Sequence, residues 1–140
     1  MMAFLTMLLA ATLQAANTDM VPMRSIDKGV MSNMDDGRQA SARTVQEWDK
    51  LWTQHAGERT RPSVDFTKEV VAAVFLGTRP TAGFSIEIVR VHQEGVALVV
   101  EYRETRPAPE SVAAQVLTSP YHIVAVPKGS TTDVKFARVP

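Results

Sequence analysis

The sequence predicts an α+β fold that is mainly β: antiparallel sheets forming a small sandwich or barrel, with one covering helix. Three observations support this fold class. Residues 70–76 are apolar throughout, which is typical of a strand that is covered on both faces. The stretches 84–91 and 96–103 alternate in character with the two-residue period of half-buried strands. Only residues 44–57 combine helical spacing with clear start and stop signals.

The composition is that of one globular domain. The chain has 140 residues, of which 45% are hydrophobic, enough for one core and too few for two domains. Its 15 basic and 15 acidic side chains cancel, whereas a nucleic-acid-binding surface needs an excess of Lys and Arg. We therefore expect no nucleic-acid partner. Cysteine is absent, so the core must stabilise the fold without disulfides.

The N-terminal residues 1–16 contain no charge and are rich in Leu, Met and Ala. This run is too short to span a bilayer and is typical of a signal peptide, with a small-residue cleavage site at residue 15 or 16. It lacks the usual Lys or Arg before the apolar run, which leaves a misassigned start or a buried N-terminal helix as alternatives. We expect a periplasmic or secreted protein whose mature chain has no integral membrane segment.

Residues 17–43 are polar and weakly patterned, which predicts an extended lead-in. A weak hairpin is expected within it, pairing a short strand near residues 26–31 with residues 39–43. The turn would lie at Asp35-Asp36-Gly37, because glycine tolerates a positive φ.

A capped helix is predicted over residues 44–56. Thr44 followed by Glu47 is a capping box, in which each side chain satisfies a backbone amide of the first turn. Gly57 provides the stop. The side chains that share one helical stripe are Trp48, Leu51, Trp52 and His55. A ligand platform is one interpretation of the two tryptophans, but packing against the core is favoured.

The strands after the helix centre on residues 70–91. A loop from Gly77 to Gly83 connects the apolar run, the expected central strand, to its expected neighbour in the sheet. A tight turn at 93–95 joins that second strand to residues 96–102. Prolines 107 and 109 mark a loop. Residues 111–117 are ambiguous between a helical turn and a strand, and their context favours a strand. Two closing strands are expected, near 121–126 and 134–139.

Residues 70–88 resemble the opening of the PrcB C-terminal-like domain family. The shared pattern is a β-run ending in Leu76-Gly77, a loop of the type Arg-Pro-Thr-Gly-Gly-Tyr and an alternating strand. The chain departs from it at Ala82, where a second glycine is frequent, and at Phe84, where tyrosine is common. Further similarity extends the predicted domain to residues 44–140. It involves Glu47-Trp48, Leu51-Trp52, Val64-Asp65-Phe66, Pro107 and residues 119–128, of which the Ser-Pro-Tyr-His part is the more diagnostic.

The family takes its name from an accessory subunit of an extracellular protease complex, and most members look like exported proteins without an assigned activity. The resemblance therefore implies a non-enzymatic, protease-associated or protease-stabilising protein. The sequence motifs are consistent with a non-enzymatic role, because no Gly-x-Ser-x-Gly elbow and no phosphate-binding loop occur. His55, His92 and His122 lack metal-ligand spacing. We expect no catalytic residue, no metal site and no cofactor.

The loop after residue 76 is the predicted partner-binding site, because proline rigidity reduces the entropy lost on binding. Its candidate residues are Arg79, Pro80, Thr81, Gly83 and Phe84, and secondary candidates are Pro120, Tyr121 and His122. The expected partner is another protein, a protease being one candidate. Two alternatives remain: a small-molecule carrier, and a protease inhibitor, since the loop is similar to one in chagasin-type inhibitors. The sequence predicts no oligomeric state.

Overall fold

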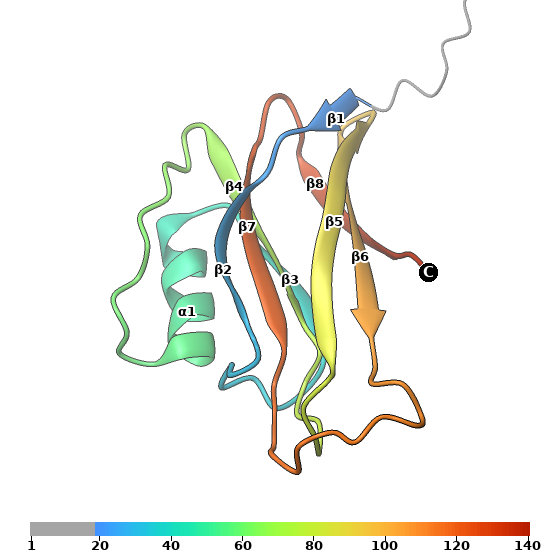
Figure 1. The fold of residues 1–140 in the computed structure, drawn as a ribbon. Helices are drawn as coiled ribbons and strands as arrows, with labels where there is room; N and C mark the ends of the chain where they lie inside the picture. The colour runs from blue at the N-terminus through green and yellow to red at the C-terminus, as the bar shows by residue number, and fades with distance from the viewer. Residues whose placement is uncertain (1–18) are drawn as a thin grey trace, which may run out of the picture.

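The computed structural model describes residues 19–140, so the predicted signal peptide, residues 1–16, lies outside the described part of the chain. The structure is a sandwich of two four-stranded sheets with one helix outside it (Figure 1). The elements are β1 (Asp19–Val21), β2 (Arg24–Gly29), β3 (Arg38–Ala42), α1 (Val45–Ala56), β4 (Glu69–Phe75), β5 (Ser85–Glu94), β6 (Ala97–Thr105), β7 (Tyr121–Pro127) and β8 (Asp133–Arg138). The predicted mainly β, α+β class is confirmed, and the sheets form a sandwich, not a closed barrel.

The strand order explains how the chain moves between the two sheets. One sheet has the order β1-β5-β6-β8 and the other β2-β7-β4-β3. All neighbouring strands are antiparallel except β6 and β8, which run parallel. The chain therefore leaves β4 for the opposite sheet, forms the β5–β6 hairpin, and returns to place β7 between β4 and β2.

Two apolar cores lie on either side of β4, which is buried from Val70 to Phe75 as its continuous apolar run predicts. Alternate residues of β4 face the opposite sheet, where they meet Ile86, Ile88 and Val91 of β5. A bulge between Ile88 and Arg90 shifts the alternation by one residue, and Val91 thereby faces inward. The other β4 side chains, including Phe75, pack beneath α1.

Helix α1 forms where its capping signals predicted. The Thr44 hydroxyl accepts a hydrogen bond from the Glu47 amide at 3.1 Å, and the Glu47 carboxylate accepts one from the Arg43 amide at 2.9 Å. Gly57 ends the helix with a φ of 60°. Trp48 and Trp52 are buried, and their indole N–H groups donate to backbone carbonyls of the following connector. Packing is thus the role of both tryptophans. No helix within residues 19–140 is long and apolar enough to cross a membrane.

Three predictions about the strands are wrong. The hairpin within residues 17–43 does not form: β2 pairs with β7 and β3 with β4, at opposite edges of one sheet. The strands β4 and β5 are not neighbours, because the loop between them crosses from one sheet to the other. Residues 111–117 form no strand and belong to the connection between β6 and β7.

Candidate functional site

Three loops meet at one end of the sandwich and form what we term the loop face: residues 30–37, 76–84 and 106–120. The registers place the ends of β2, β4 and β6 and the starts of β3, β5 and β7 at this end, which is the lower end in Figure 1. Two of the loops carry the chain between the sheets. The first loop, residues 30–37, passes from one edge of a sheet to the other. The strand order therefore brings together residues that are far apart in the sequence.

Backbone hydrogen bonds tie the predicted binding loop to both of its neighbours. Arg79 and Thr118 exchange a pair of bonds, with N···O distances of 2.7 and 2.9 Å. The Ala82 amide donates to the Ala114 carbonyl at 3.0 Å, and the Thr78 amide donates to the Asp35 carbonyl at 2.8 Å. These bonds satisfy backbone groups that regular strand pairing leaves unpaired, so the loop face has a defined backbone.

Two glycines bring the loops this close. Gly77 has a φ of 85°, and a Cβ atom there would lie 2.7 Å from the Gly37 nitrogen and 2.9 Å from the Asp35 oxygen. Gly83 has a φ of 95°, and its Cβ atom would lie 2.8 Å from Cβ of Pro107. Each glycine therefore serves both a backbone conformation that other residues rarely adopt and a close contact with another loop. The structure assigns a structural role to both.

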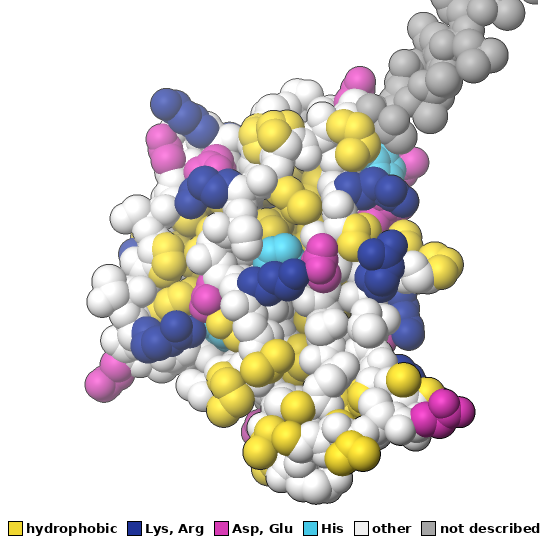
Figure 2. Space-filling view, in the orientation of Figure 1, with side chains coloured by type: hydrophobic (Ala, Val, Ile, Leu, Met, Phe, Trp, Pro, Cys, Tyr) yellow, Lys and Arg dark blue, Asp and Glu magenta, His cyan; other side chains and the backbone are white. Residues whose placement is uncertain are grey.

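Large apolar side chains are exposed on the loop face. Figure 2 shows hydrophobic side chains gathered at this end of the molecule. Val112 is fully exposed. Leu117 and Met31 expose 69% and 73% of their accessible surface, and Val30 and Val116 are also exposed. A cluster of exposed apolar side chains makes this end of the molecule the candidate contact surface.

A groove of about 190 Å³ lies on the loop face between the first and third loops. Its lining residues are Met31, Ser32, Asp35, Thr78, Leu117, Thr118 and Ser119. Met31 and Leu117 supply its apolar surface, four hydroxyl groups supply polar atoms, and Asp35 supplies the one carboxylate. The predicted binding loop contributes only Thr78.

The residues predicted in the binding loop take different positions. Pro80 and Gly83 are exposed, while Arg79, Thr81 and Phe84 are half-buried. Phe84 packs against the core between the sheets, and the Arg79 guanidinium lies 5.9 Å from the centroid of its ring. Phe84 is thus part of the scaffold. The sequence does not predict the exposed apolar residues of the neighbouring loops as site residues, because single exposed residues give no periodic pattern.

The secondary candidates Pro120, Tyr121 and His122 are all buried. They lie at the start of β7, a central strand covered on both faces, and so cannot offer their side chains to a partner. The Tyr121 hydroxyl donates to Asp27 at 2.9 Å. The Ser-Pro-Tyr-His sequence lies where the chain enters the core. The prediction that it belongs to a contact surface is therefore wrong.

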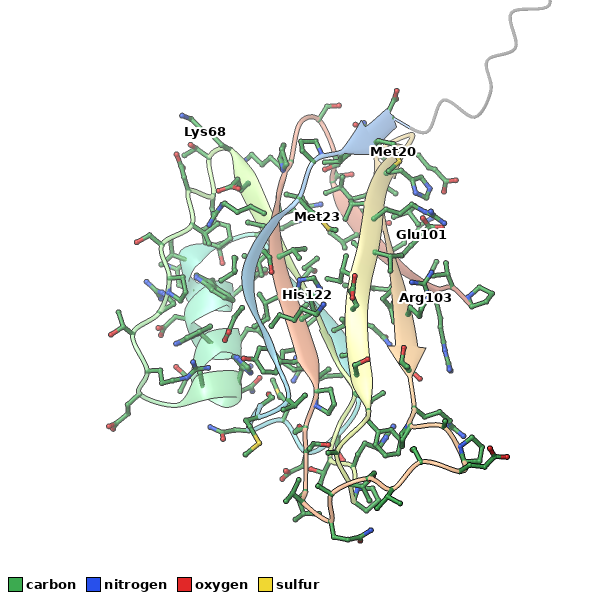
Figure 3. The ribbon with its side chains drawn as sticks, viewed as in Figure 1. Met20, Met23, Lys68, Glu101, Arg103 and His122 are labelled. Atoms are coloured by element: carbon green, nitrogen blue, oxygen red, sulfur yellow. The ribbon has the colours of Figure 1, made fainter. Side chains whose placement is uncertain are left out.

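His122 joins the two sheets. Its side chain lies between β7 and β5 (Figure 3), where Nδ1 accepts a hydrogen bond from the Ile88 amide at 2.9 Å. This acceptor role assigns the ring proton to Nε2, which lies 2.9 Å from the Ser25 hydroxyl. Burial lowers the pKa of His122 to about 4, and the nearby Lys28 ammonium acts in the same direction against a smaller opposing effect of Glu87. The imidazole is therefore neutral at pH 7.

A buried polar network connects α1 to the β2 end of the loop face. His55 Nδ1 lies 2.7 Å from the Ser32 hydroxyl, and its Nε2 lies 3.0 Å from the Asp27 carboxylate. Burial lowers the pKa of His55 despite the opposing effect of Asp27. Burial would raise the pKa of Asp27, but hydrogen bonds from His55, Tyr121 and Arg59 outweigh it and lower that pKa.

This Ser32–His55–Asp27 order resembles a hydrolytic triad, yet its contacts are those of a structural tether. Asp27 bonds Nε2 and the serine bonds Nδ1, the reverse of the arrangement in which Nε2 faces the nucleophile. The Ser32 oxygen already accepts a hydrogen bond from the Met34 amide at 3.1 Å. Sequence spacing gave no sign of this network, because its members come from three separate segments.

The described residues contain no group of three or more His, Cys, Asp or Glu side chains placed to hold a metal ion. His92, the third histidine, lies 3.8 Å from Glu101 and 3.5 Å from Glu94 on the outer side of the β5–β6 hairpin. Arg90 forms an ion pair with Glu101 across the hairpin, and Glu87 forms one with Lys28 of β2 at 2.9 Å, so ion pairing accounts for both carboxylates.

The comparison with known families agrees with this arrangement. Residues 70–127 match the family described as PrcB C-terminal. The family resemblance predicted from the sequence is thereby confirmed over β4, β5, β6, β7 and the loops between them. No similar curated protein and no similar solved structure was found.

The segment that matches the PrcB C-terminal family contains two of the three loops of the loop face, 76–84 and 106–120. The first loop, 30–37, and helix α1 precede it in the chain. The groove therefore lies where the family segment meets residues outside the match, with Thr78 and Leu117 on one side and Met31 and Asp35 on the other.

Proposed function

We propose that this protein is an exported, non-enzymatic binding domain whose loop face contacts another protein, as an accessory or stabilising component of a protease complex. The observation that carries the proposal is the cluster of exposed apolar side chains on a loop face with a hydrogen-bonded backbone. A preorganised surface of this kind loses little conformational entropy on binding.

Two further observations support the proposal. The match to the PrcB C-terminal family suggests association with a protease complex. The charge-free apolar run of residues 1–16 supports export to the periplasm or the medium. N-terminal sequencing of the protein recovered outside the cytoplasm tests the export step, and an N-terminus beginning near residue 16 or 17 is expected.

The alternatives gain less support. A small-molecule carrier needs an interior cavity, whereas the space between the sheets is filled by buried side chains of both sheets. An inhibitor of the chagasin type would use the tip of the 76–84 loop, where Pro80 and Gly83 are exposed and Phe84 is packed inward.

The contact surface is testable with substitutions that leave the core intact. Val112→Ser combined with Leu117→Ser removes two exposed apolar side chains from the loop face. Met20→Ser combined with Val96→Ser is a matched control, because both residues are exposed and lie at the opposite end of the sandwich. Crosslinking of the tagged chain to proteins of the exported fraction, followed by mass spectrometry, provides the measurement.

We expect a protease subunit to be crosslinked by the unsubstituted chain and by the control variant. Its recovery should fall about tenfold or more with the loop-face variant, since a few central apolar residues carry most of the free energy of binding. Equal recovery by both variants, or crosslinks to no specific protein, would contradict the proposed function. Equal urea midpoints for the three chains would show that folding is unchanged.

A further inference from the structure

We infer that the groove on the loop face binds a lysine or arginine side chain of the partner protein. The inference rests on the proposed function, and it adds the chemical class of the residue that is recognised. Three features of the groove lead to it: its apolar walls, its carboxylate, and the hydrogen-bonding state of its hydroxyl groups.

The apolar walls suit a long aliphatic stem. Met31 and Leu117 are among the most exposed large apolar side chains of residues 19–140, and both line the groove. Lysine and arginine carry three or four methylene groups that pack along apolar surface while the charged end stays at a polar site. A stem lying between Met31 and Leu117 would cover both.

The charge in the groove is negative. Asp35 is the one charged residue among those that line it. Its position is fixed, because its carbonyl accepts from the Thr78 amide at 2.8 Å and its Oδ1 accepts from the Thr78 hydroxyl at 3.2 Å. Neither Asp35 nor the adjacent Asp36 forms an ion pair within the described residues. A cationic end group would complement this carboxylate.

The hydroxyl groups of the groove have already used their protons. The Thr78 hydroxyl donates to Asp35, the Thr118 hydroxyl donates to the Thr81 carbonyl at 2.9 Å, and the Ser119 hydroxyl donates to the Met34 carbonyl at 2.6 Å. His55 Nε2 faces the Asp27 carboxylate and so carries the ring proton, which leaves Nδ1 to accept a hydrogen bond from the Ser32 hydroxyl. The remaining capacity of all four groups is to accept hydrogen bonds.

Such a lining selects its ligand by hydrogen bonding as well as by charge. Ammonium and guanidinium groups are donors only, whereas a carboxylate is an acceptor only. A carboxylate in this groove would face Asp35 and four hydroxyl groups that have no proton to offer. A norleucine side chain would pack against the apolar walls but would make no hydrogen bond or ion pair with Asp35 and the hydroxyl groups.

The test uses four acetylated, amidated pentapeptides, Ala-Ala-Xaa-Ala-Ala, with lysine, arginine, norleucine or glutamate at Xaa. Binding to the ¹⁵N-labelled chain is followed by NMR at up to 10 mM peptide. We expect the lysine and arginine peptides to shift the amides of Met31, Thr78 and Leu117, and the norleucine and glutamate peptides to shift them less. Asp35→Asn should weaken binding of the lysine peptide up to about fivefold, as for an exposed ion pair, and Asp36→Asn should change it less.

Four results would overturn the inference. They are the absence of shifts at the groove, equal binding of the norleucine and lysine peptides, preferred binding of the glutamate peptide, and unchanged affinity in Asp35→Asn. Self-association that Leu117→Ser abolishes would assign the surface to a second copy of the chain and would also overturn it. If Val112→Ser with Leu117→Ser abolishes crosslinking to the partner while the peptides show no basic preference, the proposed function stands and this inference falls.

Discussion

Acidification should destabilise this protein in part through the buried imidazole of His122. In the folded state its pKa is about 4, compared with about 6.5 for histidine in an unfolded chain. The unfolded state therefore takes up a proton at a higher pH than the folded state does. The contribution of His122 to stability is complete above about pH 6.5 and is lost as the pH falls towards 4.

The size of this loss follows from the two pKa values. They differ by about 2.5 units, and each unit corresponds to about 1.4 kcal/mol, so the free energy of unfolding should fall by about 3 kcal/mol. The physical cause is local: protonation of Nδ1 removes the acceptor of the Ile88 amide and places a cation near Lys28 in the buried gap between the sheets.

Urea unfolding at several pH values between 7 and 4.5 measures the effect, with His122→Asn as the matched variant. The asparagine oxygen can accept the Ile88 hydrogen bond without titrating, while the other ionisable groups titrate in both proteins. Below pH 6 the free energy of unfolding should fall more steeply with pH in the wild type than in the variant. The difference between the two slopes should approach about 1.4 kcal/mol per pH unit. Parallel stability curves, or a ring pKa near 6.5 in an NMR titration of His122, would refute the reasoning.

Three further substitutions test the scaffold by urea unfolding. Gly77→Ala should lower the free energy of unfolding by about 2–4 kcal/mol, against about 1 kcal/mol for Gly95→Ala, since both have positive φ but only Gly77 lies against backbone; equal losses would contradict the close-contact argument. Thr44→Ala should cost about 1 kcal/mol through the lost helix cap, and no loss would show that the cap is redundant. His55→Ala should cost about 3 kcal/mol because it leaves buried polar partners unpaired; a cost below 1 kcal/mol would contradict the tether.

The elements predicted correctly are those determined by local pattern. The apolar run of β4, the alternation of the β5–β6 hairpin and the Thr44–Glu47 cap of α1 each lie within a few consecutive residues. The Asp35-Asp36-Gly37 turn signal was equally local and failed. The strands on either side of this turn pair instead with strands far along the chain, β2 with β7 and β3 with β4. The local sequence pattern does not indicate which of these pairings is the more stable.

The candidate site was predicted only in part for the same reason. The loop 76–84 is recognisable from Gly77 and Gly83, but its role depends on contacts with Asp35, Thr118 and Pro107. No spacing rule connects three segments that only the strand order brings together. The apolar residues 111–117 are ambiguous in the sequence, where their context favours a strand, and much of their apolar surface is exposed in the structure. Apolar composition alone does not distinguish a core strand from a contact surface.

The matched segment 70–127 should not fold without its flanking elements. Of the sheet β2-β7-β4-β3, this segment contains only β4 and β7. Without α1, the side chains that pack beneath it would be uncovered: Val71, Ala73, Phe75 and Ile123. All four side chains are at most 2% exposed in the full domain, and uncovering side chains of this size costs about 1.5–3 kcal/mol each for the larger three. That sum is comparable to the whole stability of a small domain.

Expression of residues 19–140 and of residues 70–127 as separate proteins tests this conclusion. We expect dispersed amide resonances and a cooperative unfolding transition for the longer chain, and neither for the shorter one. A folded 70–127 fragment would mean that the two sheets bury enough surface against each other alone. Helix α1 and strands β2 and β3 would then be additions to an independent unit, whereas their packing against β4 and β7 makes them part of the same core.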